Sequence, residues 1–359
     1  MFCMLFRDTI FLTGFPGFIA SRLVERLAKS DTQFFLLVQP QLVGRAMEEI
    51  EDIAEATVTP LENFVIVEGD ISLPDLGISP EDLETIRAET TDVFHLAAIY
   101  DLSIDKEPAL KVNLEGTKNV NALVRSIKQL RRYNYVSTCY VAGKREGRIL
   151  ETELEHAAGF RNNYEETKYH AELEVERMKA EVPLTIFRPS VVVGDSETGE
   201  TAKYDGIYYL IHYLRKAPTL LRVMNVGNNE VKLNLVPVDF VVESIAALSK
   251  DPAAVGKTIA IADPDPLTTA GLFDAIVKNM TGRKSEFGPP PKITEWFLSK
   301  PFSPPITGLP HSAVPYFFIA QTYDTSEADN LLKKHGITCP RFNSYVGNLL
   351  DFVDEFPKL

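Results

Sequence analysis

The sequence predicts an α/β fold whose main part is a doubly wound, parallel β-sheet, joined to a smaller, mostly C-terminal second domain. Three observations predict it. Short apolar runs alternate with longer amphipathic stretches, a glycine-containing loop joins the first run to the first stretch, and 359 residues exceed what one hydrophobic core usually holds. Strands that alternate with helices are typical of parallel sheets, because each helical crossover returns the chain to the same edge.

Seven apolar runs rich in β-branched and aromatic residues are the predicted strands. The first helix is expected over residues 18–29, where Ile19, Leu23 and Leu27 share one face. A turn rich in aspartate and proline follows the seventh run, so we expect the chain to revisit the sheet late before leaving it. The predicted strands span residues 9–12, 34–38, 64–67, 93–97, 133–137, 184–187 and 258–262.

The C-terminal part is predicted to be less regular. Prolines crowd around the aromatic residues of segment 287–315, and proline disrupts both helices and central strands. We therefore expect an irregular, apolar cover or lid there, without a regular helix. The last clear helix is expected to begin at residues 324–327 (Asp-Thr-Ser-Glu) and to stop at Gly336.

Composition and charge exclude several classes of protein. A net charge of −13 and a pI near 5.1 would repel a phosphate backbone, so no nucleic acid partner is expected. The cysteines Cys3, Cys139 and Cys339 are too scattered for a disulfide framework or a metal site, which fits a reducing cytoplasm. The apolar opening reaches Arg7 and Asp8 at once, so neither a signal peptide nor a membrane span is expected.

Residues 13–20 (Thr-Gly-Phe-Pro-Gly-Phe-Ile-Ala) predict a dinucleotide-binding loop of the Rossmann type, because they follow an apolar strand and open a helix. Gly14 allows the tight turn, Gly17 lets the backbone approach a pyrophosphate, and Ala20 permits close packing of helix on sheet. A glycine turn without a ligand is the alternative. The expected cofactor contacts in this loop are Thr13, Gly14, Phe15, Pro16, Gly17, Phe18 and Ile19.

The end of the second strand favours NADP(H) over NAD(H), with NAD(H) as the alternative. No acidic residue stands there to hold ribose hydroxyls: Gln39 takes that place, and Arg45 lies nearby to accept a 2′-phosphate. Arg45 could equally be a solvated helix residue. Asp70, followed by Ile71, is a candidate for contact with the adenine amino group, and a turn or N-cap role for Asp70 is an equal alternative.

Tyr164 and Lys168 are the predicted catalytic pair. They lie four residues apart at the start of a long amphipathic helix, and a neighbouring ammonium is expected to lower the pKa of the phenol. Thr138 ends the fifth strand 26 residues before Tyr164, where its hydroxyl could donate to a substrate carbonyl oxygen; Ser137 is the alternative donor. Each residue alone is typical of packing or turns, but their combination downstream of a glycine loop predicts an oxidoreductase site.

These motifs resemble the extended short-chain dehydrogenase/reductase superfamily over about residues 9–248, including residues 93–98 (Val-Phe-His-Leu-Ala-Ala) and 187–190 (Phe-Arg-Pro-Ser). The resemblance implies that the backbone of Ala97 and Ala98 borders the cofactor, and that Pro189 with the following residues borders the nicotinamide. The further cofactor-binding residues expected are Asn113, in the motif 113–117, together with Ser137 and Val191.

Within the superfamily the chain is most similar to the branch of thioester reductase domains and fatty acyl-CoA reductases, which has a male-sterility-type NAD-binding domain. Residues 187–195, 205–209 and 235–239 are the basis for this, while Ala20 and Gln39 depart from the branch pattern. The resemblance implies that hydride from NADPH attacks a thioester carbonyl while Thr138 and Tyr164 stabilise or protonate its oxygen. The hemithioacetal then collapses to an aldehyde and a free thiol, and a second reduction would give the alcohol.

The expected domains are a dinucleotide-binding domain over residues 1–194, with a return of the chain at about 230–263, and a substrate domain with lid over residues 195–229 and 264–359. The expected partner is a small, apolar acyl substrate. Contact of the proline-rich segment with a membrane surface is a further hypothesis. The residues expected to line an acyl channel, unless they are ordinary core, are Tyr204, Tyr208, Tyr209 and Tyr213.

Three alternatives to thioester reduction stay open. The same fold and residues serve the oxidation or reduction of a secondary alcohol or ketone. A sugar nucleotide substrate would need basic residues in the latter half, for which Arg215, Lys216 and Arg222 are the candidates. A non-catalytic NADP sensor is the third, although such proteins commonly lose the tyrosine or lysine that this chain keeps.

Overall fold

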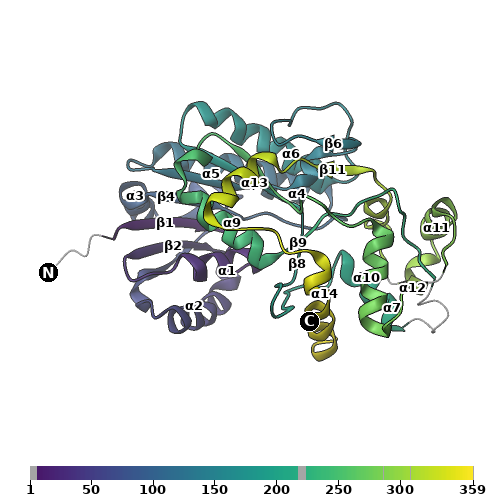
Figure 1. Ribbon diagram of the computed structural model, residues 1–359. Coiled ribbons are helices and arrows are strands. Elements are labelled where there is room, and N and C mark those ends of the chain that lie inside the picture. Colours follow the sequence, from purple (N-terminus) through teal and green to yellow (C-terminus); the bar gives the residue numbers. More distant parts are fainter. Residues whose placement is uncertain (1–5, 217–223, 286, 308, 359) are drawn as a thin grey trace.

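The computed structural model describes residues 6–216, 224–285, 287–307 and 309–358, and a seven-stranded sheet forms its centre (Figure 1). All neighbouring strands are parallel in the order β10-β7-β5-β4-β1-β2-β3, so the chain winds outward from β1 on one side and from β4 on the other. The predicted doubly wound α/β fold is confirmed. The strands are β1 (Asp8–Thr13), β2 (Thr32–Val38), β3 (Phe64–Glu68), β4 (Asp92–His95), β5 (Arg132–Val136), β7 (Leu184–Pro189) and β10 (Thr258–Ile261).

Each predicted strand overlaps an observed one. The late return of the chain is also confirmed, because β10 pairs with β7 from Thr258 opposite Ile186 to Ile261 opposite Pro189. The run 93–97 is shorter than predicted: β4 ends at His95, so Leu96 and Ala97 lie beyond the sheet. In open α/β sheets, ligands bind in the crevice just beyond the carboxyl ends of the strands.

Helices cover both faces of the sheet because successive strand residues point to opposite sides. In β1, Ile10 and Leu12 join the core beneath one group of helices, whereas Phe11 joins the core beneath the other. The first group is α1 (Phe18–Leu27), α2 (Val43–Thr57), α9 (Val238–Lys250) and α13 (Ser326–Leu332). The second group is α3 (Pro80–Glu89), α5 (Gly116–Ser126) and α6 (Asn163–Glu176), with α4 (Lys106–Ala109) and a π-helical turn (Leu110–Glu115) leading into α5.

A separate apolar cluster lies among helices beside the sheet. In Figure 1 the helices α7, α10, α11 and α12 form a group to the right of the main sheet, and α14 packs against α10. Two small parallel sheets complete the arrangement. The elements are α7 (Ile207–Lys216), α10 (Thr269–Thr281), α11 (Pro291–Leu298), α12 (Ser303–Thr307) and α14 (Phe342–Glu355), with β8 (Val191–Val193) paired to β9 (Leu235–Pro237) and β6 (Gly147–Ile149) paired to β11 (Gln321–Tyr323).

Two C-terminal expectations were wrong. The proline-rich segment does contain helices, because Pro291 stands at the first position of α11, where the missing N–H costs no hydrogen bond. The helix that begins at Ser326 does end at Gly336, after a final 3₁₀ turn, but it is not the last. The helix α14 follows, and its N-cap residue is Arg341, which provides none of the usual capping side chains.

No helix within the described ranges combines the length with the apolar character that crossing a bilayer requires.

Candidate active site

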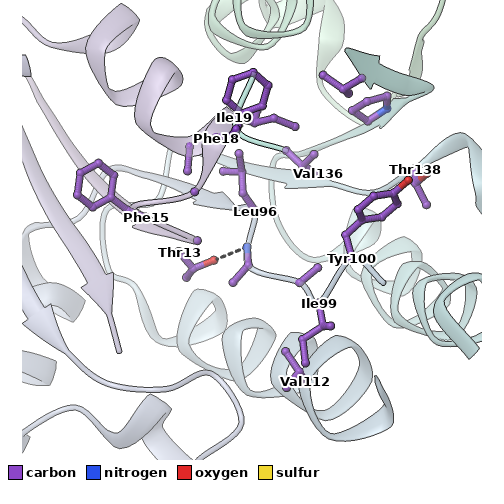
Figure 2. A pocket seen from close by; sticks show the side chains of 18 of the residues that line it. Thr13, Phe15, Phe18, Ile19, Leu96, Ile99, Tyr100, Val112, Val136 and Thr138 are labelled. Atoms are coloured by element: carbon purple, nitrogen blue, oxygen red, sulfur yellow. Dashed lines mark hydrogen bonds between the residues drawn. The ribbon is translucent and has the colours of Figure 1, made fainter. Parts of the chain in front are cut away.

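A cavity of about 590 Å³ opens beyond the carboxyl ends of β1, β4, β5 and β7, where the winding of the sheet changes direction (Figure 2). This is the place where open α/β sheets bind their ligands. Most of the residues predicted from the sequence meet there, although they come from loops distant in the chain. Those that line the cavity are Thr13, Gly14, Phe15, Pro16, Gly17, Phe18, Ile19, Gln39, Asp70, Ile71, Ala97, Ala98, Ser137, Thr138, Tyr164, Lys168, Pro189 and Val191.

The glycine loop fits a nicotinamide dinucleotide. Gly14 has a φ of 101°, and a Cβ added there would lie 2.8 Å from the backbone nitrogen of Ala97, so only glycine is accommodated. Gly17 caps α1 and has no side chain to occupy the first N–H groups of that helix, and its first residues line the cavity, so this helix start is a candidate anion site. The Thr13 hydroxyl accepts a hydrogen bond from the Ala97 N–H at 3.2 Å, which joins the loop to the end of β4 (Figure 2).

At the expected adenosine end, the amide of Gln39 donates to a carboxylate oxygen of Asp70 at 2.9 Å. The other Asp70 oxygen accepts the N–H of Ser72 at 2.8 Å, so the turn role of Asp70 is present alongside its place in the cavity wall. Burial tends to raise the pKa of Asp70, but the hydrogen bonds from Ser72 and Gln39 outweigh it and hold the pKa below its usual value. Arg45 is not brought into the cavity wall: it lies exposed on the first turn of α2.

Asn113 does not line the cavity either, because its side chain is buried in a structural role. Its Oδ1 accepts the N–H of Ile99 at 2.9 Å, and its amide donates to Thr167 on α6 at 3.1 Å. Asn113 therefore ties the loop after β4, which does line the cavity, to the helix that bears Tyr164. His95 is likewise structural, since both ring nitrogens contact threonine hydroxyls and burial lowers its pKa to about 3.

Tyr164 is the second residue of α6, and its side chain is almost fully buried at the cavity wall. The Asn162 side chain caps this helix by accepting the N–H of Glu165 at 3.0 Å, which fixes the first turn. Burial raises the pKa of Tyr164, and a hydrogen bond with Thr138 opposes the rise. The Tyr164 phenol therefore stays protonated near neutral pH and can act as a hydrogen-bond donor.

Lys168 lies one turn further along α6 and is buried. Its ammonium donates to the Tyr135 hydroxyl at 3.1 Å and to the Val136 carbonyl at 3.0 Å. Burial lowers the pKa of Lys168 to about 8, against the attraction of the Glu172 carboxylate. The expected lowering of the Tyr164 pKa by this ammonium is wrong for this geometry, because burial dominates and raises it.

Ser137 is engaged elsewhere, so the alternative that it donates to a substrate carbonyl is wrong for this arrangement. Its hydroxyl donates to Glu172, a carboxylate with no exposed side-chain surface. The guanidinium of Arg188 donates to the same carboxylate, from Nε at 2.8 Å. Thr138 is left as the strand-end hydroxyl beside Tyr164.

Sequence reasoning missed several wall residues nearest to Thr138. The ring of Tyr100 packs edge-on against that of Tyr164, with centroids 5.1 Å apart, and Figure 2 shows Tyr100 and Thr138 at the same end of the cavity. Lys203 places its ammonium 5.6 Å from the centre of the Tyr100 ring and 3.5 Å from Asp205. The only sequence signal for this group was the family motif that begins at Asp205, because side-chain direction in loops has no periodicity.

A second cavity, of about 370 Å³, is almost entirely apolar and lies among α7, α10 and α11. Of the expected channel residues, Tyr209 and Tyr213 line it. Tyr204 and Tyr208 do not: Tyr208 is fully buried and its hydroxyl accepts the N–H of Gly194 at 2.9 Å, so it belongs to the core. Most of the remaining wall is built from the rings and aliphatic chains of Leu210, Met224, Val226, Phe273, Pro289, Ile293, Trp296, Phe297, Leu298, Leu309, Phe317 and Phe318.

Of the basic residues considered for a sugar nucleotide, the structure describes the side chain of Arg215. Arg215 bonds to the C-terminal helix α14, through the Leu350 carbonyl at 2.5 Å and Asp354 at 2.7 Å. Arg222 lies outside the described residues, as do the side chain of Lys216 and the N-terminal Cys3.

Comparisons with known proteins identify the family of this chain. Residues 12–245 match the family described as male sterility protein, whose model is an NAD-binding domain. The fatty acyl-CoA reductase wat of Drosophila melanogaster is 28% identical over 286 residues, which cover 69% of this chain and 55% of that protein. Fatty acyl-CoA reductase 1 of Mus musculus is 25% identical, covering 66% and 53%. The chain thus spans about half the length of these curated relatives.

Among solved structures, the terminal R domain of the myxalamid PKS-NRPS biosynthetic pathway superposes with a TM-score of 0.80, at 23% identity over 98% of this chain and 92% of that one. This likeness shows the shared fold, including the C-terminal helices. Because the family match covers more than half of the chain, this protein belongs to the male sterility family, within the fatty acyl-CoA reductase and thioester reductase branch of the extended short-chain dehydrogenases/reductases.

Proposed function

We propose that this chain is an NAD(P)H-dependent reductase that converts an acyl thioester, bound to coenzyme A or to a carrier, into an aldehyde or alcohol. The observation that carries the proposal is the meeting of Thr138 and Tyr164 in one cavity with the glycine loop of α1. The relatives described as fatty acyl-CoA reductases and the apolar second cavity support the choice of an acyl substrate.

In this mechanism the two hydroxyls bind the carbonyl oxygen of the substrate. Burial keeps Tyr164 protonated, so it donates a hydrogen bond that strengthens as negative charge develops on that oxygen, and Thr138 positions the phenol and shares the charge. The dinucleotide would be held with its pyrophosphate at the glycine loop and its nicotinamide at Pro189 to Val191, and its nicotinamide would supply the hydride. Lys168, held to the end of β5 by Tyr135 and Val136, supplies positive charge beside the cavity.

No covalent intermediate with the protein is needed. Cys139 follows Thr138, but it is buried and its thiol donates to the Arg188 carbonyl at 3.1 Å. Burial raises the pKa of Cys139, so it would hold its proton and be a poor nucleophile. Direct hydride transfer is therefore the route that these residues support.

We propose NADP(H) as the preferred cofactor, with NAD(H) as the second candidate. Gln39, directly after β2, is uncharged, so it does not repel a 2′-phosphate as an acidic residue at that position would. Dissociation constants for NADPH and NADH, from titration of protein fluorescence, decide between them. Tighter binding of NADH would overturn this choice, and an unchanged NADPH affinity in Arg45→Ala would agree with the exposed position of Arg45.

The first experiment measures NADPH consumption with acyl-CoA thioesters, ketones and aldehydes, using Tyr164→Phe as the matched control. Thioester-dependent oxidation of NADPH that the variant loses supports the proposal. Turnover of ketones without thioesters would move the protein to the secondary alcohol alternative. Tight NADPH binding without turnover of any substrate would favour the sensor alternative.

A further inference from the structure

The cover segment of residues 314–318 contacts the helix of the proposed catalytic tyrosine through one hydroxyl. The Tyr316 hydroxyl donates to the Glu165 carboxylate at 2.6 Å and accepts from the Asn162 amide at 2.8 Å. Asn162 and Glu165 flank Tyr164 on the first turn of α6, and Asn162 is its cap. Tyr316 therefore binds the helical turn that positions Tyr164, although it lies 152 residues further along the chain.

Both partners of this hydroxyl are themselves held in place. Glu165 has no exposed side-chain surface, and Arg161 donates to it at 3.0 Å. Burial, and then the adjacent Glu165 carboxylate, raise the pKa of Tyr316, so its hydroxyl stays protonated and acts as a donor. Without the Tyr316 hydroxyl, the Glu165 carboxylate keeps its two donors from Arg161 but loses the third, so the first turn of α6, which carries it, is held less firmly.

The ring of Tyr316 contacts the turn that begins at Thr138, the other hydroxyl proposed to bind the substrate. It packs on the ring of Tyr140 with centroids 4.5 Å apart. The Tyr140 N–H donates to the Thr138 hydroxyl oxygen at 3.2 Å. One side chain thus touches both segments, the strand-end turn with Thr138 and the helix start with Tyr164.

The next two residues of the same segment face a different space. Phe317 and Phe318 line the apolar second cavity, and both pack with Leu298 and Leu309 of the cover. Tyr316 instead belongs to the cluster of Tyr140 and Tyr164. The cover segment therefore has its tyrosine in the cluster of Tyr140 and Tyr164 and its phenylalanines in the wall of the apolar cavity.

We propose that Tyr316 is a positioning residue that couples occupation of the apolar cavity to the alignment of Thr138 and Tyr164. An apolar acyl chain in that cavity packs against Phe317 and Phe318 and holds the segment in place, and Tyr316 then holds the two hydroxyls at the thioester carbonyl. Binding energy from the chain, remote from the reacting carbon, thereby appears in kcat. This inference rests on the proposed thioester reduction.

The test compares wild type, Tyr316→Phe and Tyr345→Phe with butanoyl-, octanoyl- and dodecanoyl-CoA at saturating NADPH. Tyr316→Phe keeps the ring and loses the hydroxyl. Tyr345→Phe is the matched control. It removes a hydroxyl that is buried in the apolar cluster beside the sheet and that has no hydrogen-bond partner among the described residues. NADPH affinity and the unfolding midpoint are measured for all three proteins.

Wild type and Tyr345→Phe should show a kcat that rises with chain length. In Tyr316→Phe the kcat for dodecanoyl-CoA should fall by about 10- to 100-fold, the cost of a small misplacement of reacting groups, while KM still decreases with chain length. The affinity for NADPH should not change. A chain-length dependence of kcat that Tyr316→Phe retains, or that wild type lacks, overturns the coupling.

Hydrogen exchange without substrate separates this inference from the proposed function. Peptides that contain residues 163–167 should exchange faster in Tyr316→Phe than in wild type and Tyr345→Phe, because the first turn of α6 has lost an anchor. Equal exchange in the three proteins overturns the positioning role. If wild type reduces no thioester at all, the proposed function fails, and the exchange result alone then decides whether Tyr316 positions Tyr164.

Discussion

Replacing Glu172 by glutamine should destabilise the fold and shift the pH dependence of activity. The same buried carboxylate pairs with Arg188 and, against the effect of burial, raises the pKa of Lys168. Glu172 lies on α6, one turn beyond Lys168, and has no exposed side-chain surface. It accepts hydrogen bonds from Arg188 and from Ser137. Glutamine keeps the volume and one acceptor oxygen but loses the charge.

The stability loss can be worked from the exposure of the pair. The Arg188 side chain is 5% exposed and that of Glu172 is 0% exposed, so the substitution leaves a guanidinium buried without its counter-charge. Removing one partner of a buried pair costs about 3–5 kcal/mol. Because glutamine still accepts one hydrogen bond, we expect the free energy of unfolding to fall by about 3 kcal/mol, the lower end of that range.

The effect on activity follows from Lys168. Burial lowers the pKa of Lys168 to about 8, and the Glu172 charge opposes that lowering. Without the charge the pKa falls further, so the ammonium loses its proton at a lower pH. If the charged form is the active one, kcat/KM decreases above this pKa, and the decrease should begin at a lower pH in Glu172→Gln than in wild type.

Urea unfolding at neutral pH and a pH profile of NADPH oxidation measure both effects. Glu174→Gln on the same helix is the control, because its pair with Arg177 is largely exposed, with side chains 31% and 67% accessible. Such pairs contribute about 0–1 kcal/mol. The reasoning is refuted if Glu172→Gln costs no more than Glu174→Gln, or if the alkaline limb of activity stays in place.

Three further predictions follow from other parts of the site and fold. Tyr164→Phe should lower kcat by about 10²- to 10⁴-fold, because the phenol donates to the developing oxyanion, while fluorescence titration should give an unchanged NADPH affinity; a kcat equal to that of wild type would contradict this. Gly14→Ala should lower the unfolding midpoint and weaken NADPH binding, since its Cβ would lie 2.8 Å from the Ala97 nitrogen at a φ of 101°. The strain is about 1–3 kcal/mol, and an unfolding midpoint of Gly14→Ala equal to that of wild type would argue against the close approach. Burial raises the pKa of Glu151 from 4.5 to about 7, against backbone N–H donors that lower it. The folded state then holds a proton that the unfolded state releases, so wild-type stability should fall by about 3 kcal/mol as the pH rises from about 4.5 to 7. Glu151→Gln should lack this pH dependence when its free energy of unfolding is measured in urea at the two pH values. An equal change in the free energy of unfolding for both proteins would disprove the prediction.

The strands and the first helix could be predicted because their signal is local. Apolar runs such as 34–38 and 258–262 are periodic or continuous over a few residues, whatever they pack against. The helix α11 was not predicted, because the prolines of its segment were taken as helix breakers, although Pro291 occupies the first helical position, where proline is favourable. The helix α14 was not predicted, because its N-cap residue Arg341 is not one of the usual capping residues, whereas the sequence 324–327 contains such residues before the helix at Ser326.

By itself the sequence determined which groups could do chemistry: a glycine loop after a strand, and a Thr138, Tyr164 and Lys168 set at recognisable spacing. The tertiary structure decided how they are used. It directed the Ser137 hydroxyl to Glu172 and left Arg45 outside the cavity. It also brought Tyr316 onto the first turn of α6. Spacing along a helix or strand follows from its backbone period, whereas contacts between distant segments depend on how their side chains pack, which no local period encodes.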